Sequence, residues 1–453
     1  MDLNITWDGL ARASGGRLVR GDPGDRVRSI STDSRKLGCA DIFWALSGTR
    51  FDAHDFLGAA TAAADGWVVQ RGRTAADGRL ATHIVEVPDT LKALQALAAW
   101  HRQRFDIPVA AVVGSNGKTS TKEMLRAICA QAGAVCATPG NLNNQFGLPL
   151  SVLELGETHR YAVFELGESR FGDIDELARI CRPTVGVLTN VGPAHLEWLG
   201  DLEGVFRCLS ELVTASPPDT VFTVNLDDPW LSALETQLGK RAITYGRGER
   251  ATVELRDSPA GVIELVVQRH KITAPLACPG RLHQLNAAAA AAGALGMGLG
   301  PDQIAKGLET FRPAPMRFEP RRHPSGAWLV VDAYNANPAS MRAGIESFLD
   351  AYQNCRLILV LGEMKELGKE SARFHRELGE WVGSLPLEAV FFAGPDMKEA
   401  AAEAAKSGVP RVIRHADEPA ALAPEIKSLL GPDAAVYFKA SRAVALERVV
   451  DEL

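Results

Sequence analysis

The fold is decided by residues 109–121, Val109-Ala110-Ala111-Val112-Val113-Gly114-Ser115-Asn116-Gly117-Lys118-Thr119-Ser120-Thr121. The stretch opens with a continuous apolar run, which is typical of a strand buried in a parallel sheet. A small polar turn containing glycine follows, and residues 122–132 then have the pattern of a helix. A strand, a turn and a helix in this order predict a phosphate-binding loop, because backbone N–H groups at a helix N-terminus converge on an anion.

The residue types in the turn fit this chemistry. Gly114 and Gly117 allow the backbone to approach phosphate closely, Lys118 adds a point charge, and the Thr119 hydroxyl can reach Mg²⁺. The general loop pattern has a further glycine five residues before Gly117, where this chain has Val112. A Gly-Lys-Thr triplet also occurs by chance, but here the strand and helix that the loop needs are both present. We therefore expect nucleotide binding.

Composition limits the class of protein. A chain of 453 residues is too long for one core, so we expect two or three domains. A net charge of −6 argues against a general nucleic-acid binder. The seven cysteines are scattered without metal-type spacing and are interpreted as buried thiols in a reducing compartment. We see no signal peptide and no run of about 18 apolar residues, and expect a cytoplasmic protein without a membrane span.

Residues 1–84 are predicted to form a first, small α/β domain. A short helix is expected over Thr6–Ala13, a polar loop over Ser29–Arg35, a strand over Ile42–Leu46, and a helix that starts near Phe51–Phe56 and runs through Ala64. Two interpretations of the polar loop stay open. Ser31, Asp33 and Arg35 form turn hydrogen bonds and a surface ion pair, or they hold a charged ligand.

Residues 85–310 are predicted to form the central domain. An amphipathic helix over Thr90–Arg104 leads into the phosphate loop. Further strands are expected over residues 162–166, 184–190, 221–225 and 263–267. Strands alternating with helices predict a mainly parallel sheet covered on both faces. Ligands gather at the carboxyl ends of such strands, where this chain places Glu165, Asn190 with His195, and Asn225 with Asp227.

Residues 311–453 repeat the alternation and predict a second open α/β domain. Its expected strands are residues 328–332, 357–361, 389–393 and 436–439, with a helix that ends near residue 350. The segment Phe311–Pro315 is a natural hinge, because its two prolines interrupt a helix. The predicted fold class is thus α/β with three domains.

Several polar residues are candidates for nucleotide chemistry. Glu165 and His195 are the potential Mg²⁺ ligands that share a domain with the loop, although a single buried Glu or His is often only a satisfied core residue. Arg317 reaches phosphate if the third domain closes over the second, and is otherwise a surface residue. Asp332 ends a strand and either accepts ribose hydroxyls or caps the helix that follows.

Further stretches accompany the loop and span nearly the whole chain. They are Ser31-Thr32-Asp33-Ser34-Arg35, Phe51-Asp52-Ala53-His54, Gly140-Asn141-Leu142-Asn143-Asn144, Glu165-Leu166-Gly167, Ala194-His195-Leu196-Glu197, Asp332-Ala333-Tyr334-Asn335-Ala336-Asn337-Pro338, Gly362-Glu363-Met364-Lys365-Glu366-Leu367-Gly368 and Lys439-Ala440-Ser441-Arg442. In this order they resemble the Mur ligases, and among these the branch that adds D-alanyl-D-alanine to a UDP-N-acetylmuramoyl-tripeptide.

The resemblance implies a function. ATP, with Mg²⁺, would phosphorylate the terminal carboxylate of the UDP-linked tripeptide, and the amine of D-alanyl-D-alanine would then attack the acyl phosphate to form an amide. This is a cytoplasmic step of peptidoglycan precursor synthesis. The three domains would bind the UDP-sugar peptide, ATP and the incoming dipeptide, the last in a Rossmann-like fold. The family also implies a monomer.

The resemblance implies roles for residues by position. It assigns catalysis to Lys118, Glu165, His195 and Arg317, and metal binding to Thr119, Glu165 and His195. It assigns ATP binding to Gly114, Ser115, Asn116, Gly117, Lys118, Thr119, Ser120, Asn286, Arg317 and Asp332, UDP-substrate binding to Ser31, Asp33, Ser34, Arg35, Asn143 and Asn144, and dipeptide binding to Asn335 and Asn337.

The chain departs from the family in two places. The resemblance implies a lysine twelve residues after Glu197, carbamoylated to support a second Mg²⁺, but this chain has Leu209 there and no lysine from residue 123 to 239. Glu211 or Asp201 are the carboxylates considered as replacements. A His-Asn pair of the family is replaced by Leu282-His283, so His283 is expected to substitute in contacts to ATP or these contacts weaken.

Two alternative functions stay open. A related amide ligase with another amino substrate, such as a folylpolyglutamate-type enzyme, would share the ATP chemistry. A nucleotide-binding partner protein that has lost catalysis would account for Leu209. The intact Lys118, Glu165 and His195 argue against the second alternative.

Overall fold

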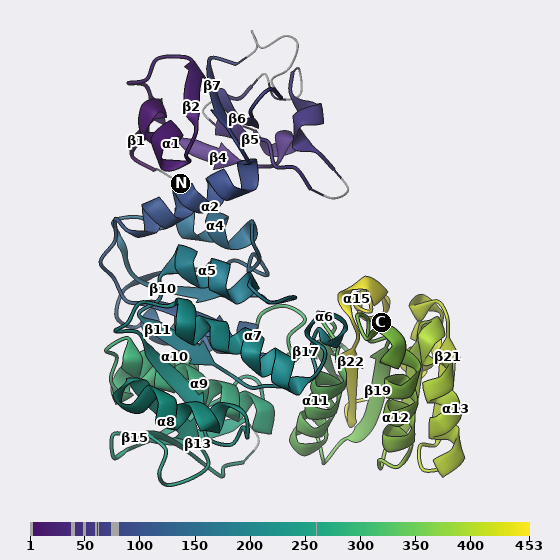
Figure 1. Cartoon of the computed structure of the whole chain (residues 1–453). Helices are drawn as coiled ribbons and strands as arrows, with labels where there is room; N and C mark the ends of the chain where they lie inside the picture. The colour runs from purple at the N-terminus through teal and green to yellow at the C-terminus, as the bar shows by residue number, and fades with distance from the viewer. Residues whose placement is uncertain are drawn as a thin grey trace.

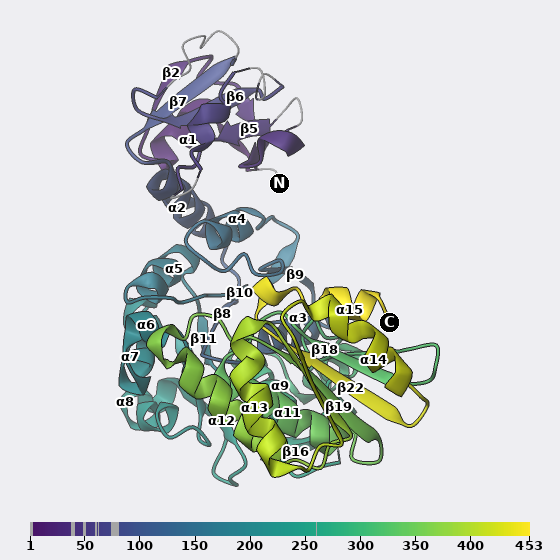
Figure 2. The same cartoon turned by 90° about the vertical axis from the view of Figure 1, so that its right-hand side faces the viewer.

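The computed structural model describes residues 3–37, 41–48, 51–58, 61, 63–73, 81–259 and 261–453. These residues form three main sheets and a small ladder of β1 and β3, and the first sheet extends through β7 (His83–Val87), past the expected boundary at residue 84. The N-terminal sheet stands apart from the rest of the molecule, and the C-terminal sheet lies beside the central one (Figure 1). In the view turned by 90°, the C-terminal elements lie in front of the central domain (Figure 2).

The N-terminal domain is a five-stranded sheet with the order β2-β7-β6-β5-β4. Its elements are β1 (Ile5–Thr6), α1 (Trp7–Ala13), β2 (Arg17–Arg20), β3 (Arg26–Val27), β4 (Ser29–Ser31), β5 (Asp41–Trp44), β6 (Gly66–Gln70) and β7 (His83–Val87). The predicted helix at Thr6–Ala13 is confirmed, and the Thr6 hydroxyl accepts the N–H of Gly9 at its start (3.2 Å). Trp7, Trp44 and Trp67 fill the interior.

Two predictions for this domain were wrong. Ser29–Ser31 is a parallel strand that pairs with β5, whereas a loop was expected. Of the helix expected from Phe51–Phe56 through Ala64, the structure describes a 3-10 turn over Ala53–Phe56, a bend at Gly58 and 3-10 conformation at Thr61, while residues 59, 60 and 62 lie outside the described residues. The turn starts at its N-cap Asp52, whose carboxylate accepts the backbone N–H of His54, and it ends because Leu57 is extended and Gly58 has a positive φ of 124°.

The central domain is a nine-stranded sheet with the order β16-β15-β14-β13-β12-β11-β8-β10-β9. Its elements are α2 (Thr90–Arg102), β8 (Val109–Val113), α3 (Lys118–Cys129), β9 (Ala134–Ala137), α4 (Gly147–Leu153), β10 (His159–Glu165), α5 (Asp173–Cys181), β11 (Val185–Leu188), α6 (Leu196–Leu199), α7 (Leu202–Ala215), β12 (Val221–Asn225), α8 (Leu234–Leu238), β13 (Ala242–Gly246), β14 (Val253–Arg256), β15 (Val262–Val267), β16 (His270–Pro275), α9 (Arg281–Gly296) and α10 (Pro301–Thr310). Strands β8 to β14 pair in parallel with their neighbours, and β15 and β16 add an antiparallel edge.

The strand that decides the fold lies in the middle of this sheet, between β10 and β11. All five side chains of β8 are buried, as the apolar run predicts. Helix α3 begins at Lys118, four residues earlier than expected, directly after Gly117. The alanine-rich helix α9 packs against α3, and its small side chains let the two helices approach closely. The phosphate loop is therefore fixed from both sides by buried elements.

The C-terminal domain is a six-stranded sheet with the order β17-β18-β22-β19-β20-β21. Its elements are β17 (Glu319–Arg322), β18 (Trp328–Asp332), α11 (Pro338–Ala351), β19 (Arg356–Gly362), α12 (Ser371–Gly383), β20 (Ala389–Ala393), α13 (Lys398–Ser407), β21 (Val412–Ala416), α14 (Ala423–Leu429), β22 (Ala434–Lys439) and α15 (Glu447–Asp451). The four predicted strands are confirmed, and the antiparallel β17 and the parallel β21 were not predicted.

Two further expectations concern the whole chain. No helix among the described residues is long and apolar enough to cross a bilayer. The six described cysteines are free thiols, and all but Cys355 are buried, as expected. Cys39 lies outside the described residues.

Candidate active site

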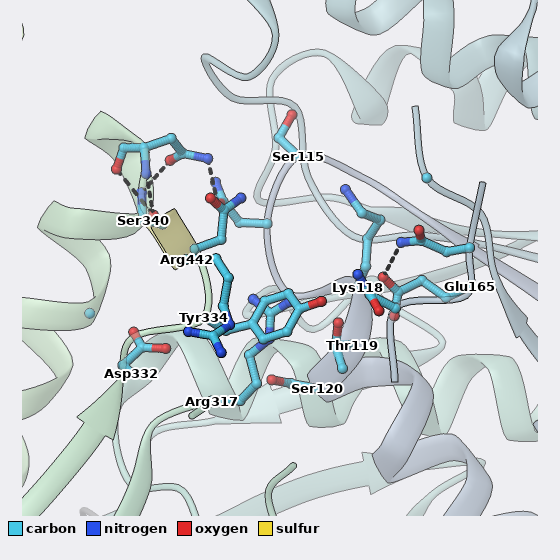
Figure 3. Close-up of a pocket in the computed structure, with 18 of the residues that line it drawn as sticks. Ser115, Lys118, Thr119, Ser120, Glu165, Arg317, Asp332, Tyr334, Ser340 and Arg442 are labelled. Carbon is cyan, nitrogen blue, oxygen red and sulfur yellow. Dashed lines mark hydrogen bonds between the residues drawn. The ribbon is translucent and has the colours of Figure 1, made fainter. Parts of the chain in front are cut away.

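One cavity of about 510 Å³ lies between the central and C-terminal domains. Lys118, Thr119 and Glu165 enter it from the central domain, opposite Asp332, Tyr334 and Arg442 from the C-terminal domain (Figure 3). The predicted site residues that line the cavity are Ser115, Asn116, Gly117, Lys118, Thr119, Ser120, Asn143, Asn144, Glu165, His195, Asn286, Arg317, Asp332, Asn335 and Asn337. Residues more than 200 positions apart in the sequence, such as Asn116 and Asn337, thus meet at one site in the folded chain.

The remaining predicted residues lie elsewhere. Gly114 begins the phosphate loop but does not line the cavity. Ser31, Asp33, Ser34 and Arg35 belong to the N-terminal domain, away from the cavity. There Arg35 pairs with Asp33 through two hydrogen bonds of 2.8 and 2.9 Å, and the backbone N–H of Asp33 donates to the Ser31 hydroxyl. The turn-and-ion-pair interpretation describes this geometry, and a role in ligand binding stays a prediction.

The phosphate loop needs its glycines for steric reasons. Gly114 and Gly117 both have positive φ angles, of +139° and +81°. A Cβ atom on Gly114 would lie 2.0 Å from the Thr189 hydroxyl oxygen, and one on Gly117 would lie 2.2 Å from Asn286 Oδ1. Either contact would force the loop or the contacting side chain to move, and the positive φ would strain any other residue. These positions therefore hold the loop against β11 and α9.

The end of β11 anchors the loop through hydrogen bonds. The backbone N–H of Ser115 donates to the carbonyl of Asn190 (3.0 Å), and that of Asn116 donates to Asn190 Oδ1 (3.1 Å). The Thr189 hydroxyl donates to the carbonyl of Asn116 (2.6 Å). Asn190, which the sequence placed at a strand end, thus positions the loop. The N–H groups at the start of α3 stay directed at the cavity, where an anion would bind.

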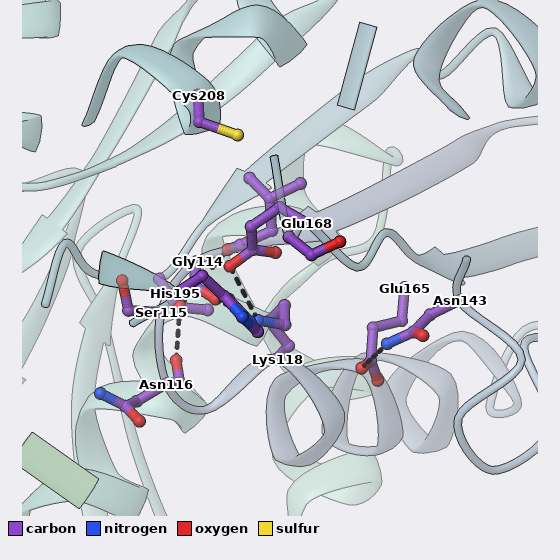
Figure 4. A network of polar contacts seen from close by, with 12 residues as sticks. Gly114, Ser115, Asn116, Lys118, Asn143, Glu165, Glu168, His195 and Cys208 are labelled. Carbon is purple, nitrogen blue, oxygen red and sulfur yellow. Dashed lines mark hydrogen bonds and ion pairs between the residues drawn. The ribbon is translucent and has the colours of Figure 1, made fainter. Parts of the chain in front are cut away.

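Lys118 is held by two acceptors. Its ammonium donates to the carbonyl of Gly114 (2.5 Å) and to Glu168 Oε1 (3.1 Å). The Glu168 side chain is fully buried and lines the same cavity (Figure 4). Sequence reasoning missed Glu168. The available signal was its place in the turn after β10, three residues beyond Glu165.

Glu165 and His195 also occupy the cavity, as predicted. The Asn143 amide donates to Glu165 Oε1 (2.8 Å), while the buried Glu165 Oε2 has no hydrogen-bond partner among the described residues. His195 Nδ1 lies 3.4 Å from Glu366 Oε2 of the C-terminal domain. The hydrogen bond from His195 lowers the pKa of Glu366. Neither Glu165 nor His195 is therefore a satisfied core residue.

The C-terminal wall is organised around Asp332. Its carboxylate accepts hydrogen bonds from the Tyr437 hydroxyl and the Lys439 ammonium, both at 2.7 Å. The alternative that Asp332 caps the following helix is wrong, because Asn337 caps α11 by accepting the N–H of Ser340. The Asn337 amide also donates to Asn116 Oδ1 of the phosphate loop (3.1 Å). This bond links the two walls directly.

Arg317 lines the cavity, so its interpretation as an ordinary surface residue does not hold. The guanidinium carbon lies 4.0 Å from the centre of the Tyr334 ring, which positions the cation by a cation–π contact. Burial raises the pKa of Tyr334, and the charge of Arg317 opposes this shift. Tyr334, Lys439 and Arg442 were not among the predicted site residues. Tyr334 lies within the motif Asp332–Pro338, and Lys439 and Arg442 are the ends of the motif Lys439–Arg442.

His283 is a buried imidazole with no hydrogen-bond partner for either ring nitrogen among the described residues. Its ring centre lies 4.7 Å from that of Phe318, and both residues line the cavity beside Asn286. Burial lowers the pKa of His283 to about 4, although Asp332 opposes the shift. The ring is therefore neutral near pH 7 and has a donor and an acceptor to offer a ligand.

The burial of His283 predicts a pH effect on stability. The unfolded chain gains a proton on this residue near pH 6.5, whereas the folded protein gains it only near pH 4. Between these values the unfolded state binds more protons, so acidification lowers the free energy of unfolding. Between pH 7 and pH 5, we expect the melting temperature of the His283→Asn variant to fall less than that of the unchanged protein. His270→Asn, at an exposed position, is the control; equal losses in all three proteins would contradict the expectation.

The residues present fit a magnesium nucleotide. Thr119, Glu165 and His195 offer a hydroxyl, a carboxylate and an imidazole to one cavity. The unpartnered buried oxygen of Glu165 is an observation in favour of a cation there. Among the described residues, no three His, Cys, Asp or Glu side chains form a metal site by themselves. Mg²⁺ beside nucleotides generally takes one or two carboxylates and completes its shell with phosphate oxygens and water.

Comparisons with known proteins agree with this architecture. Residues 112–294 match the family model described as the Mur ligase middle domain, and residues 316–442 match "Mur ligase, glutamate ligase domain". A relative from Bacillus subtilis named UDP-N-acetylmuramoyl-tripeptide--D-alanyl-D-alanine ligase is 34% identical, over 94% of this chain and 93% of its own. The chain belongs to the Mur ligase family. The resemblance inferred from the motifs is thereby confirmed.

Solved Mur ligases share the fold of the whole chain. A structure of MurF from Acinetobacter baumannii has a TM-score of 0.90 at 31% identity and covers 99% of this chain and 98% of its own. MurF from Thermotoga maritima, solved in complex with ADP, has a TM-score of 0.81 at 30% identity and covers 94% and 97%. The predicted α/β class with a mainly parallel central sheet is therefore confirmed.

In this Mur ligase, Leu209 is an ordinary core residue. It lies on α7, is fully buried and packs within the apolar core. The two carboxylates considered as replacements are engaged elsewhere. Asp201 caps α7 by accepting the N–H of Gly204, and Glu211 accepts the N–H groups of Gly172 and Asp175. Neither of them lines the cavity.

Proposed function

We propose that this chain is an ATP-dependent amide ligase that joins D-alanyl-D-alanine to UDP-N-acetylmuramoyl-tripeptide in peptidoglycan precursor synthesis. One observation carries the proposal. A phosphate loop, carboxylates and cationic side chains of two domains share one cavity, in a chain whose full-length relatives are named for this reaction. Phosphoryl transfer between two anions needs this concentration of positioned charge rather than a covalent nucleophile.

The first step forms an acyl phosphate. A carboxylate oxygen of the tripeptide attacks the γ-phosphorus of ATP, and the bond to the ADP oxygen breaks. The N–H groups at the start of α3 and the Lys118 ammonium hold the phosphates, and Arg317 and Arg442 offer positive charge from the facing wall. Thr119, Glu165 and His195 would hold Mg²⁺, which when bound neutralises phosphate charge.

The second step forms the amide. The amine nitrogen of D-alanyl-D-alanine attacks the acyl carbon, the C–O bond to phosphate breaks, and the nitrogen loses a proton. Asn335 and Asn337, on the C-terminal wall, would orient the dipeptide. The bond between Asn337 and Asn116 ties this wall to the phosphate loop, so the amine would be presented where the acyl phosphate forms. Closure of the two domains would exclude water, which otherwise hydrolyses the acyl phosphate.

The UDP-sugar would occupy the N-terminal domain. Ser31, Asp33, Ser34 and Arg35 provide hydroxyls and charges there, and Asn143 and Asn144 would meet the peptide end of the substrate in the cavity. We propose domain boundaries near 84/85 and 310/311; the first falls within β7 (His83–Val87) of the N-terminal sheet, and the second directly follows α10. We also propose that the enzyme acts as a monomer in the cytoplasm, where free thiols such as its six described cysteines stay reduced.

The function is tested by phosphate release from the purified protein with Mg²⁺. We expect turnover with ATP, the UDP-linked tripeptide and D-alanyl-D-alanine together, and background release when any one is omitted. Glutamate in place of the dipeptide is the control for a folylpolyglutamate-type activity. Turnover with glutamate would contradict the assigned amino substrate. The absence of phosphate release with every combination would favour a nucleotide-binding protein without catalysis.

A further inference from the structure

Glu168 is a buried carboxylate for which the fold supplies one short contact. Its side chain is fully buried, its Oε1 lies 3.1 Å from Lys118 Nζ, and its buried Oε2 has no hydrogen-bond partner among the described residues. A buried charge normally has several partners, because its desolvation is costly. Glu168 also lines the cavity. The unpartnered Oε2 of Glu168 is therefore available to a group that enters the cavity together with the substrates.

A neighbouring carboxylate shows what a structural role looks like here. Asp173, five residues later, accepts the backbone N–H groups of Ser169 and Arg170, the Ser169 hydroxyl and the Arg170 guanidinium. These bonds shape the turn before α5. The Glu168 carboxylate has no such bond to backbone in the described part of the chain, and its partner is the phosphate-loop lysine. A role in holding the turn does not explain Glu168.

The position of Glu168 relates it to the departure at Leu209. Burial raises the pKa of the Cys208 thiol, and the charges of Glu211 and Glu168 add to this shift, so the Glu168 carboxylate lies close to α7. Cys208 immediately precedes Leu209, and in the view of Figure 4 Glu168 lies between Cys208 and Lys118. The acidic group that Leu209 cannot supply is thus present near α7, in the turn after β10.

We propose that Glu168 is a divalent-cation ligand of this ligase, supplying the negative charge that a leucine at residue 209 cannot carry. The inference rests on the proposed function and concerns the same cavity. Glu165 and Glu168 each present a buried, unpartnered oxygen there, and oxygen ligands of this kind suit Mg²⁺. A carboxylate at Glu168 carries one negative charge without any modification. This enzyme therefore needs no bicarbonate for its metal site.

A consequence concerns Lys118. Its ammonium holds Oε1 of Glu168, beside the Oε2 that the cation would bind, so Lys118 and the cation compete for the charge of one carboxylate. Nucleotide phosphates offer Lys118 another anionic partner. Nucleotide binding would thus release Glu168 for the cation, and the two ligands would strengthen each other's binding.

The experiment counts Mn²⁺ bound to the full chain by electron paramagnetic resonance, with a non-hydrolysable ATP analogue present. We expect a second Mn²⁺ to bind beyond the one on the phosphates. Glu168→Gln keeps the size of the side chain and removes its charge. It should lower the affinity for the second Mn²⁺ by about 10- to 100-fold or more, since loss of a group that only supports a metal ligand already has an effect of this size. The affinity for the first Mn²⁺ should not change. Glu211→Gln, outside the cavity, should retain both.

Two further variants make the result decisive. Glu168→Asp retains the charge and should retain the second Mn²⁺ with lower affinity, which separates loss of a ligand from loss of the fold. The double variant Glu168→Gln, Leu209→Lys should regain the second Mn²⁺ only with bicarbonate. A second Mn²⁺ that survives Glu168→Gln, or its absence from the unchanged protein, would overturn the inference. Because this readout needs no D-alanyl-D-alanine, a failure of the proposed function in the phosphate-release assay would be recognised separately.

Discussion

Lys118→Met is expected to lower kcat for phosphate release by about 10³-fold, the effect of removing a positioned charge that stabilises a transition state. Lys118 is the cation of the phosphate loop and the first residue of α3. Its ammonium is held by the Gly114 carbonyl and by the Glu168 carboxylate. Methionine keeps much of the side-chain length and removes the ammonium. Steady-state phosphate release at saturating substrates measures the change. Lys306→Met, on the exposed side of α10, is the control and should retain full activity.

The same variant has a second effect that must be separated from the first. Removing the ammonium leaves the buried Glu168 carboxylate without its partner, which destabilises the protein. The double variant Lys118→Met, Glu168→Gln removes both charges and should recover the melting temperature but not the activity. A single variant within about tenfold of normal kcat would contradict the role of Lys118, since a loss that small corresponds to about 1.4 kcal/mol.

The main sheets could be predicted because their strands are continuous apolar runs. β12, β18 and β20 match the expected residues closely, since a strand buried on both faces needs no alternation to be recognised. Strand direction carries no such signal, so the antiparallel pairing of β15 with β14 and β16 was not anticipated. β17, with the sequence Glu-Pro-Arg-Arg, is polar and short and was missed altogether.

The candidate site could be predicted where one local pattern contains the chemistry. The Gly-Lys-Thr turn and the carboxylate at the end of β10 are of this kind. Contacts between distant segments were not visible: Glu168 meets Lys118 across 50 residues, and Lys439 meets Asp332 across 107. In each pair the partner is set by sheet order and not by sequence spacing. A buried acid three residues after a predicted metal ligand was a signal that sequence reasoning passed over.

Asp332→Ala is expected to lower the stability of the C-terminal domain by about 3–5 kcal/mol, the usual cost of breaking a buried ion pair from one side. Asp332 and Lys439 end neighbouring parallel strands, β18 and β22, and their side chains are only 14% and 4% exposed. Alanine would leave the Lys439 ammonium buried, with the Asn335 carbonyl as its remaining acceptor. The Tyr437 hydroxyl would lose its acceptor as well. Urea unfolding followed by hydrogen exchange of β18 and β22 would measure the loss.

Burial is what makes this ion pair costly to break, and an exposed ion pair in the same domain provides the comparison. Arg356 and Asp433 also form a close pair (2.9 Å), but their side chains are 37% and 61% exposed, so water replaces the lost partner. Asp433→Ala should therefore cost at most about 1 kcal/mol. The double variant Asp332→Ala, Lys439→Met removes both buried charges and should recover much of the stability. If Asp332→Ala and Asp433→Ala cost the same, the buried pair would not be the element that holds the C-terminal wall of the cavity in place.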